Sequence, residues 1–356
     1  MSAGERLAAV RGKLGELSLD AFLVLGAENR RYLSGFTGSA GGLIITPDRA
    51  FLATDYRYLE QVQTEAPGFT VLKWKNRPGE VLAQALGPGP HRLGFEKEIL
   101  TCGEFERIKA AAAEVELVPV EGLVENLRAV KDADELGAIR EAAALVVSVW
   151  ERVPALLREG RGEAEAALDL EFELRRAGSE EAPFQIILAS GPQAALPHAR
   201  PGGRRLARGD VVILDVGAVR RGYASDFTRT LVVGPAESRH RELHQIVVQA
   251  RDAAVAKVAP GVKAAEVDRA AREVIAAAGY GEAFGHGLGH GVGLAVHEAP
   301  RLTAESADVL AAGMVVTIEP GLYIPGWGGV RVEDMVLVTP DGCEVLTPLP
   351  TDLVEL

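Results

Sequence analysis

The sequence predicts an α/β (α+β) protein with two domains, and three observations support this class. The chain has 356 residues, which suits two domains of ordinary size. In its first third, short apolar runs alternate with stretches of helical periodicity. From residue 132 onward, two pairs of helical stretches each precede strand-like segments, which indicates a pseudo-two-fold repeat of helix pair and strands. We therefore predict an N-terminal domain at residues 1–128 and a C-terminal domain at residues 129–356.

The N-terminal domain is expected to be a compact α/β unit. Short apolar runs predict its strands, and segments of helical spacing between them predict its helices. The Pro/Gly cluster at residues 87–90 interrupts both patterns and predicts a loop. The predicted strands are residues 20–25, 42–45, 51–53 and 116–120, and the predicted helices are residues 58–65 and 102–113.

The C-terminal domain is expected to carry its helices in two pairs, each joined by a short link that contains glycine. Asp132 or Asp134 can cap the first helix, with Glu135 in its first turn. Gly178 can end the second helix. The four predicted helices are residues 132–157, 163–177, 239–258 and 263–278.

The charge balance and the cysteine content exclude several classes of protein. The chain carries 38 Lys and Arg against 50 Asp and Glu, a net charge of −12, which argues against binding to nucleic acid or to an anionic membrane. Cys102 and Cys343 lie far apart and form no disulfide framework, which suits a reducing compartment. Residues 1–14 lack the apolar core of a signal peptide, and no apolar run is long enough to span a membrane. We expect a cytoplasmic protein.

Two aspartates flank a predicted hairpin in the C-terminal domain. The strand VVILD ends in Asp215, and the strand DFTRTLVV begins at Asp226. A turn centred between Arg220 and Arg221 would place these aspartates directly opposite each other, where like charges are destabilising. A bound divalent cation would remove that repulsion. Alternatively, the turn is not symmetric and one aspartate faces solvent.

Three histidines lie within the glycine-rich stretch FGHGLGHGVGLAVHEAP at residues 284–300. They are His286, His290 and His297, and glycines next to them would let the backbone approach a ligand closely. The stretch does not contain the zinc motif HExxH. It could hold metal or substrate, or it could be a loop with solvated histidines.

Two glutamates lie in apolar strand patterns further along the chain. Glu319 ends MVVTIE, and Glu333 lies within GVRVEDMVLV. A glutamate among β-branched residues is rarely buried without a partner. Together with Asp215, Asp226 and His290, these glutamates could hold two divalent cations in a hydrolytic centre.

The motifs LDVGAVRRGYASDFTRT, GHGLGHGVGLAVHEAPR, TIEPGLY and GVRVEDMV, in this order, resemble those of the pita-bread metallopeptidases. That family includes methionine aminopeptidase, prolidase, aminopeptidase P and creatinase. The resemblance implies a pita-bread catalytic domain at residues 129–356, preceded by a creatinase-like domain. It also implies that two divalent metal ions are bound, with manganese favoured and cobalt or zinc possible. The implied metal ligands are Asp215, Asp226, His290, Glu319 and Glu333, of which Asp226 and Glu333 bridge the ions.

The resemblance extends to residues that would act on the substrate. A water activated by the two cations would attack the first peptide bond, with Glu319 transferring its proton. His297 would donate to the developing oxyanion, and His198 would lie near the substrate. Substrate-binding roles are implied for His286, Arg301, Arg331 and Tyr223. The alternatives are surface salt bridges for the arginines and a core position in the hairpin for Tyr223.

The N-terminal segments NRRYLSGFTGSAGGLIIT and FLATDYRYLEQ resemble those of aminopeptidase P more than those of prolidase. The favoured function is therefore an Xaa-Pro aminopeptidase that takes peptides with proline in second position, with a homodimer expected. The alternative is an Xaa-Pro dipeptidase (prolidase). A methionine aminopeptidase, or a binding module of this fold that has lost catalysis, is less favoured, because the extra N-terminal domain and the full ligand set are both present.

Overall fold

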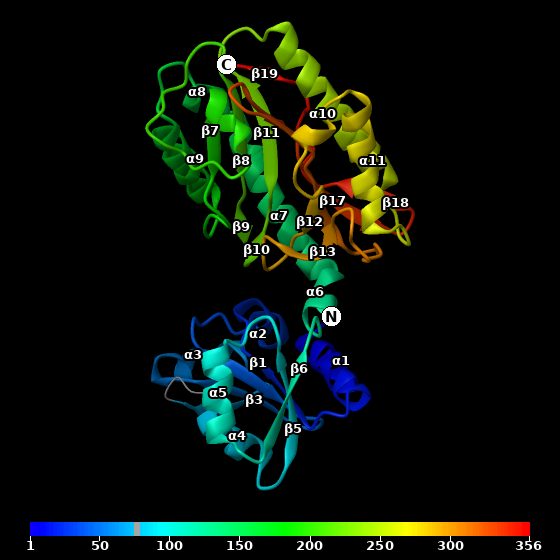
Figure 1. The fold of residues 1–356 in the computed structure, drawn as a ribbon. Coiled ribbons are helices and arrows are strands. Elements are labelled where there is room, and N and C mark those ends of the chain that lie inside the picture. The colour runs from blue at the N-terminus through cyan, green and yellow to red at the C-terminus, as the bar shows by residue number, and fades with distance from the viewer. Residues whose placement is uncertain (75–78) are drawn as a thin grey trace. The chain divides into compact units, whose positions relative to one another are not determined.

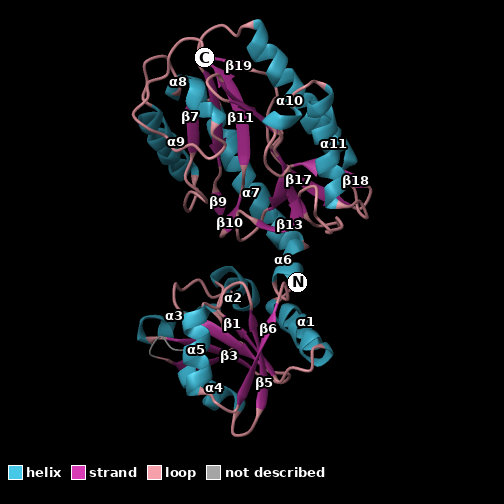
Figure 2. Cartoon of the chain, viewed as in Figure 1, coloured by secondary structure: helices cyan, strands magenta, loops and turns pink. Residues whose placement is uncertain are grey.

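The computed structural model describes residues 1–74 and 79–356, and the chain divides into two compact units. The first unit is Met1–Arg128 and the second is Ala129–Leu356. Figure 1 shows the order of the elements along the chain, and Figure 2 separates helices from strands. In the part of the chain that the structure describes, no helix is long and apolar enough to cross a membrane.

The first unit contains a mixed sheet with strand order β4-β3-β2-β1-β5-β6. β2 is antiparallel to both of its neighbours, β1 and β3, whereas the other neighbouring strands pair in parallel, so β2 alone runs in the opposite direction. Buried side chains of α4 and α5, among them Leu82 and Ile108, pack with Leu23, Ile44 and Phe51 from the sheet. The strands are β1 (Ala21–Val24), β2 (Gly42–Ile45), β3 (Ala50–Thr54), β4 (Thr70–Lys73), β5 (His91–Glu96) and β6 (Val115–Val120). The helices are α1 (Ala3–Glu16), α2 (Ala27–Ser34), α3 (Leu59–Glu65), α4 (Gly79–Leu86) and α5 (Cys102–Ala111), followed by α6 (Glu125–Ala129) at the end of the unit.

The strands and helices predicted for this unit are present, with ends that shift by one or a few residues. The loop predicted at residues 87–90 is also present. Helix α1 has no counterpart in the prediction, although Ser2 and Glu5 form a capping box at its start.

The second unit carries the two expected helix pairs. Asp132 caps α7 by accepting hydrogen bonds from the N–H groups of Asp134 and Glu135, and Gly178 ends α9 with φ 117°. The single helix predicted at residues 132–157 is interrupted after Trp150, because Pro154 lacks the N–H that would continue the ladder. The helices are α7 (Ala133–Trp150), α8 (Val153–Leu156), α9 (Glu163–Ala177), α10 (Ser238–Lys257) and α11 (Ala264–Ala277).

The strands of the second unit form two main sheets. One has the order β19-β11-β8-β7, and the other has the order β13-β12-β14-β17-β18. The hairpins β9–β10 and β15–β16 lie beside them. Their bounds are β7 (Ile187–Ser190), β8 (Val211–Val216), β9 (Val219–Arg220), β10 (Tyr223–Ala224), β11 (Phe227–Val232), β12 (Gly289–Gly291), β13 (Glu298–Leu302), β14 (Val315–Ile318), β15 (Gly321–Ile324), β16 (Gly328–Arg331), β17 (Asp334–Thr339), β18 (Gly342–Val345) and β19 (Val354–Glu355).

Strand β8 lies between two hydrophobic cores, and packing on both faces fixes the position of Asp215 near its end. Val212 and Leu214 face a core shared with α7, α8 and α9, whereas Val211 and Ile213 face a core shared with α10 and α11. Side chains alternate along a strand, so Asp215 lies on the same face as Val211 and Ile213. This face carries the candidate site.

Candidate active site

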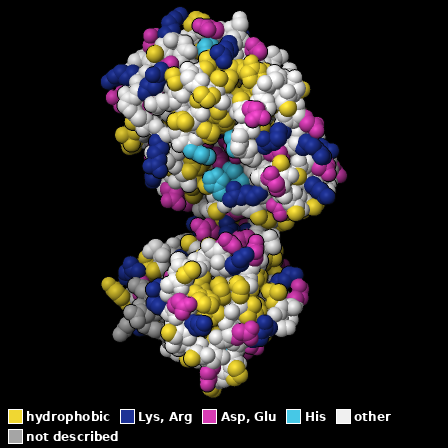
Figure 3. All heavy atoms as spheres, viewed as in Figure 1, with side chains coloured by type: hydrophobic (Ala, Val, Ile, Leu, Met, Phe, Trp, Pro, Cys, Tyr) yellow, Lys and Arg dark blue, Asp and Glu magenta, His cyan; other side chains and the backbone are white. Residues whose placement is uncertain are grey.

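A cavity of about 440 Å³ opens in the second unit. Figure 3 shows histidine side chains gathered at a hollow in this unit, with acidic side chains beside them. Apolar side chains form part of the wall: Phe184, Ile187, Pro197 and Ala199. The polar lining includes the predicted site residues His198, Asp215, Asp226, His286, His290, His297, Arg301, Glu319, Arg331 and Glu333.

The two aspartates meet in this cavity, but not in the predicted register. Asp215 is paired with Thr228, and Tyr223 is paired with Arg220, so the hairpin is centred between Arg221 and Gly222. Asp226 is therefore a diagonal neighbour of Asp215 and not its direct partner. Asp226 lies two residues before Thr228, the actual partner of Asp215. Because side chains alternate between the faces of a strand, the carboxylates of Asp215 and Asp226 still lie on the same face of the sheet.

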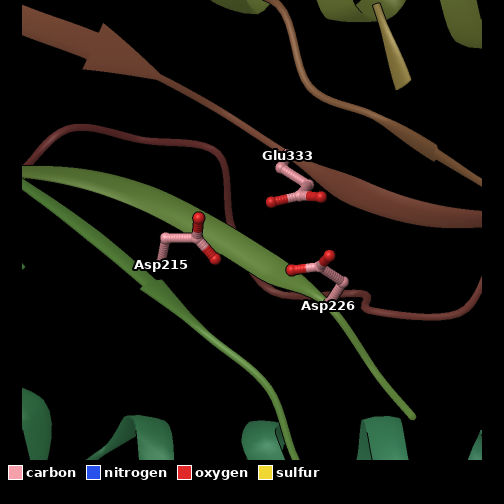
Figure 4. Close-up of side chains that lie close together, drawn as sticks. All are labelled: Asp215, Asp226 and Glu333. Carbon is pink, nitrogen blue, oxygen red and sulfur yellow. The ribbon is translucent and has the colours of Figure 1, made fainter. Parts of the chain in front are cut away.

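Glu333 reaches the same point from the other sheet. The continuous strand predicted at residues 329–338 is divided into β16 and β17, and Glu333 lies between them. Its N–H donates to the Thr228 carbonyl at 3.1 Å, and Thr228 Oγ1 donates to Glu333 Oε2 at 2.6 Å. These two bonds attach the segment between β16 and β17 to β11, and they direct the Glu333 carboxylate toward the aspartates (Figure 4).

The carboxylates of Asp215, Asp226 and Glu333 place one oxygen each within 4.8 Å of one another. Burial raises the pKa of all three, and mutual repulsion of the carboxylates adds to the large increase in pKa for Asp226 and Glu333. Asp215 Oδ1 is buried and has no hydrogen-bond partner among the described residues. A divalent cation would satisfy that oxygen and relieve the repulsion, so these side chains fit the predicted metal site.

His290 and Glu319 adjoin this cluster. His290 Nε2 lies 3.7 Å from Asp226 Oδ2 and 3.3 Å from Glu319 Oε1. Hydrogen bonding and charge from His290 lower the pKa of Glu319 despite its burial. Thr317 Oγ1 accepts from the His290 N–H and donates to Glu319, which orients both residues. The structure thus brings together all five side chains predicted as metal ligands.

Arg331 is buried against the cluster and is not a surface residue. It donates to Asp215 Oδ2 at 2.6 Å, to Thr228 Oγ1 at 3.2 Å and to the Tyr323 hydroxyl at 2.8 Å. A further bond reaches the Pro197 carbonyl. The guanidinium of Arg331 is therefore engaged with the metal-site carboxylate and its neighbours; because Arg331 also lines the cavity, its substrate contact stays a prediction.

Both ring nitrogens of His286 are also occupied. Nδ1 lies 2.7 Å from the Gly287 carbonyl, which can only accept, so Nδ1 carries the proton. Desolvation lowers the pKa of His286, which favours the neutral ring, and Nε2 then accepts from the Tyr323 hydroxyl at 3.0 Å. A direct polar contact between these nitrogens and substrate is not supported by this arrangement.

His297, His198 and Arg301 line the cavity with exposed side chains. The His297 ring lies 4.2 Å from that of His290, centroid to centroid. Desolvation and the neighbouring His290 lower the pKa of His297 to about 4, so it is neutral near pH 7 and can donate through one N–H. Arg301 is the cross-strand partner of His290 in the β12–β13 ladder.

Comparison with known proteins identifies the family of this chain. The model of metallopeptidase family M24 matches residues 137–340, and that of the creatinase/prolidase N-terminal domain matches residues 6–130. The chain belongs to metallopeptidase family M24. The resemblance to pita-bread metallopeptidases and the predicted order of domains are thereby confirmed.

Three relatives illustrate the similarity. The structure of an Xaa-Pro dipeptidase from Bacillus anthracis superimposes with a TM-score of 0.95, at 40% identity and full coverage of both chains. An Xaa-Pro dipeptidase from Pyrococcus horikoshii is 38% identical over 338 residues, 95% of each chain. The structure of an X-Pro aminopeptidase from Thermotoga maritima has a TM-score of 0.90, at 34% identity, and covers 98% of this chain and 99% of that one.

Tyr223 lies outside the cavity of this M24 chain. Its hydroxyl donates to Glu135 Oε1 at 2.9 Å, and its ring packs beside Ile139 and Val292. This position supports the alternative of a hairpin core residue and corrects the predicted substrate contact.

Three residues that organise the M24 site were not predicted from the sequence. Thr228 lies two positions after Asp226, so strand alternation could have placed it on the cavity face. Thr317 precedes Glu319 by the same interval and could have been found in the same way. Tyr323 lies in the quoted motif TIEPGLY, but no spacing in the sequence shows that its hydroxyl joins Arg331 to His286.

Proposed function

We propose that this M24 peptidase is an Xaa-Pro dipeptidase that hydrolyses the bond between a first residue and a C-terminal proline. The family and the relatives support the broader activity class of a proline-specific metal-dependent exopeptidase. Two of the relatives above are named as Xaa-Pro dipeptidases and one as an X-Pro aminopeptidase. This proposal reverses the preference for aminopeptidase that the N-terminal motifs suggested.

The observation that carries the proposal is the position of Arg301 beside the metal-ligand cluster. In a dipeptide, the free carboxylate lies only one residue beyond the scissile bond. Arg301 pairs with His290 across neighbouring strands and lines the same cavity. Its exposed guanidinium can therefore form a bidentate bond with that carboxylate.

The side chains of the cavity have distinct roles in this account. Glu319 accepts a proton from the attacking water and passes it to the leaving nitrogen. Neutral His297 donates to the developing oxyanion. Apolar groups such as Ile187 and Pro197 offer a surface for the proline ring, which has no amide hydrogen to bind.

Asp215, Asp226, His290, Glu319 and Glu333 would hold the divalent cations. Bound there, the cations would supply Lewis acidity and increase the acidity of the attacking water. We propose manganese as the native metal, because it suits a set of ligands dominated by carboxylates.

An Xaa-Pro aminopeptidase is the second candidate, supported by the Thermotoga maritima relative and by the N-terminal segments noted above. The two activities differ in whether the residue after proline is required. An aminopeptidase gains binding from that residue, whereas a dipeptidase loses its carboxylate contact when the chain continues.

The test compares Arg301→Met and Arg200→Met with the wild type on the dipeptide Ala-Pro and the tripeptide Ala-Pro-Ala. Arg200 also lines the cavity, but on a segment without a metal ligand. We expect Arg301→Met to raise KM for the dipeptide at least tenfold, with a smaller change for the tripeptide. An equal effect on both substrates, or a larger effect of Arg200→Met, would contradict the role of Arg301.

A further inference from the structure

The loop that carries His286 is held by an ion pair on α11 between a buried aspartate and a partly exposed arginine. Asp268 is fully buried, and Arg272, one helical turn later, donates to both of its carboxylate oxygens at 2.9 and 2.7 Å. Helix α11 is the yellow helix labelled in Figure 1. Neither residue lines the cavity, so a direct contact with substrate is excluded by position.

This pair binds the backbone of every second residue of the loop. Arg272 donates to the carbonyls of Phe284 at 3.0 Å and His286 at 2.8 Å. Asp268 accepts from the N–H of Leu288 at 3.0 Å. The Arg272 guanidinium also lies over the Phe284 ring, 4.3 Å from its centroid. Together, these contacts fix the loop over five consecutive residues.

Two sets of hydrogen bonds connect this loop to the catalytic groups. The Leu288 carbonyl accepts from the N–H of Glu319 at 2.9 Å, so the loop locates the residue assigned to proton transfer. His286 presents Nε2 to the Tyr323 hydroxyl, which in turn accepts from Arg331.

We propose that Asp268 and Arg272 are positioning residues for this site. By holding the loop, they keep His286 in the tautomer protonated at Nδ1, with Nε2 as the acceptor for Tyr323. The hydrogen bonds then run in one direction, from Arg331 to Tyr323 to His286 to the Gly287 carbonyl. The kinetic part of this inference rests on the proposed function, whereas the tautomer does not.

The experiment uses Arg272→Met in the full chain, with Arg269→Met as the matched control. Arg269 also lies on α11 and pairs with Glu273 four residues later, but both side chains are exposed. Each protein is loaded with diamagnetic zinc for ¹⁵N NMR of the histidine rings. The His286 signal is the one that disappears in His286→Gln, and kcat and KM are measured on Ala-Pro.

We expect the wild type and Arg269→Met to show His286 protonated at Nδ1. Arg272→Met should show a mixture of tautomers, and its kcat should fall about 10- to 100-fold with KM within about threefold. If Arg272→Met does not fold, the His286 tautomer, kcat and KM are measured in Arg272→Lys instead. The same changes are expected there, because an ammonium group cannot reproduce the four hydrogen bonds of the planar guanidinium.

A folded Arg272 variant with the wild-type tautomer and kcat within twofold of wild type would overturn the proposal. It would show that the pair only stabilises the fold. If the wild type does not cleave Ala-Pro, the proposed function fails, but the tautomer in Arg272→Met still supports or overturns the positioning role.

Discussion

Arg331 Nη2 donates to Asp215 Oδ2 at 2.6 Å, and this ion pair sets one buried positive charge against three neighbouring carboxylates. The second oxygen of Asp215 is buried without a partner among the described residues. The arginine therefore orients Asp215 but leaves an excess of negative charge. That excess is what a site for divalent cations requires.

Arg331→Met should destabilise the protein when no metal is bound. Removing one partner of a buried ion pair typically costs about 3–5 kcal/mol, because the remaining charge is uncompensated. The free energy of unfolding, measured by urea titration with a chelator, should fall by about that amount, and manganese should restore part of it. Arg241→Met is the control, because its pair with Glu355 is exposed and should contribute no more than about 1 kcal/mol. Equal losses in both variants would refute the structural role of Arg331.

Glu319→Gln should separate metal binding from proton transfer. The amide cannot accept the proton of the attacking water, so kcat should fall by several orders of magnitude. Some metal should remain, because Asp215, Asp226 and Glu333 are unchanged. Activity on Ala-Pro and metal content by mass spectrometry test this, and wild-type activity in Glu319→Gln would exclude the assignment.

His297→Ala and His290→Ala should have different consequences. Loss of a donor to the developing oxyanion costs about 2.7–4 kcal/mol, or about a hundred- to thousandfold in kcat, and the metal content of His297→Ala should stay near wild type. His290→Ala should lose one ion as well as activity. If His297→Ala loses metal and His290→Ala keeps both ions, the two roles have been exchanged. If His297→Ala stays within twofold of wild type, His297 does not act on the intermediate.

His244 on α10 should make stability depend on pH. Its burial, followed by the positive charge of Arg229, lowers its pKa to about 4, compared with about 6.5 in an unfolded chain. Between these values the unfolded chain binds a proton that the folded protein does not. The free energy of unfolding should therefore fall as the pH drops from about 6.5 to 4, by up to about 3 kcal/mol.

His244→Gln should remove this contribution, because glutamine does not titrate. Urea unfolding in the presence of a chelator, at a series of pH values from 4 to 7, should show a smaller loss of stability in the variant than in the wild type. Parallel curves for the two proteins would show that His244 does not carry the effect.

Several elements that depend on local patterns were predicted from the sequence. Helix α9 has the predicted bounds, because an apolar periodicity and Gly178 define it locally. The five candidate ligands were predicted from the aspartates of the hairpin, a histidine in a glycine-rich stretch and two glutamates in apolar strand patterns, together with the resemblance to the pita-bread metallopeptidases. The break between β16 and β17 was not predicted, because it depends on hydrogen bonds between Glu333 and Thr228, 105 residues earlier in the chain.

The remaining errors have a similar origin. The hairpin register depends on the exact centre of a turn, which the sequence RRG leaves open by one residue. The sequence also did not show the tertiary partners of Arg331 and Tyr223, which are Asp215 and Glu135. Motif position shows that a polar side chain is near a site, whereas only the folded structure shows which atoms it contacts.

The most direct test of the account is the rate of hydrolysis of Ala-Pro against Ala-Pro-Ala, before and after exhaustive chelation and readdition of manganese. We predict cleavage of the dipeptide at a higher kcat/KM than the tripeptide, loss of both activities on chelation, and recovery with manganese. A preference for the tripeptide would contradict the dipeptidase assignment in favour of the aminopeptidase. Full activity after verified removal of metal would contradict the metal centre itself.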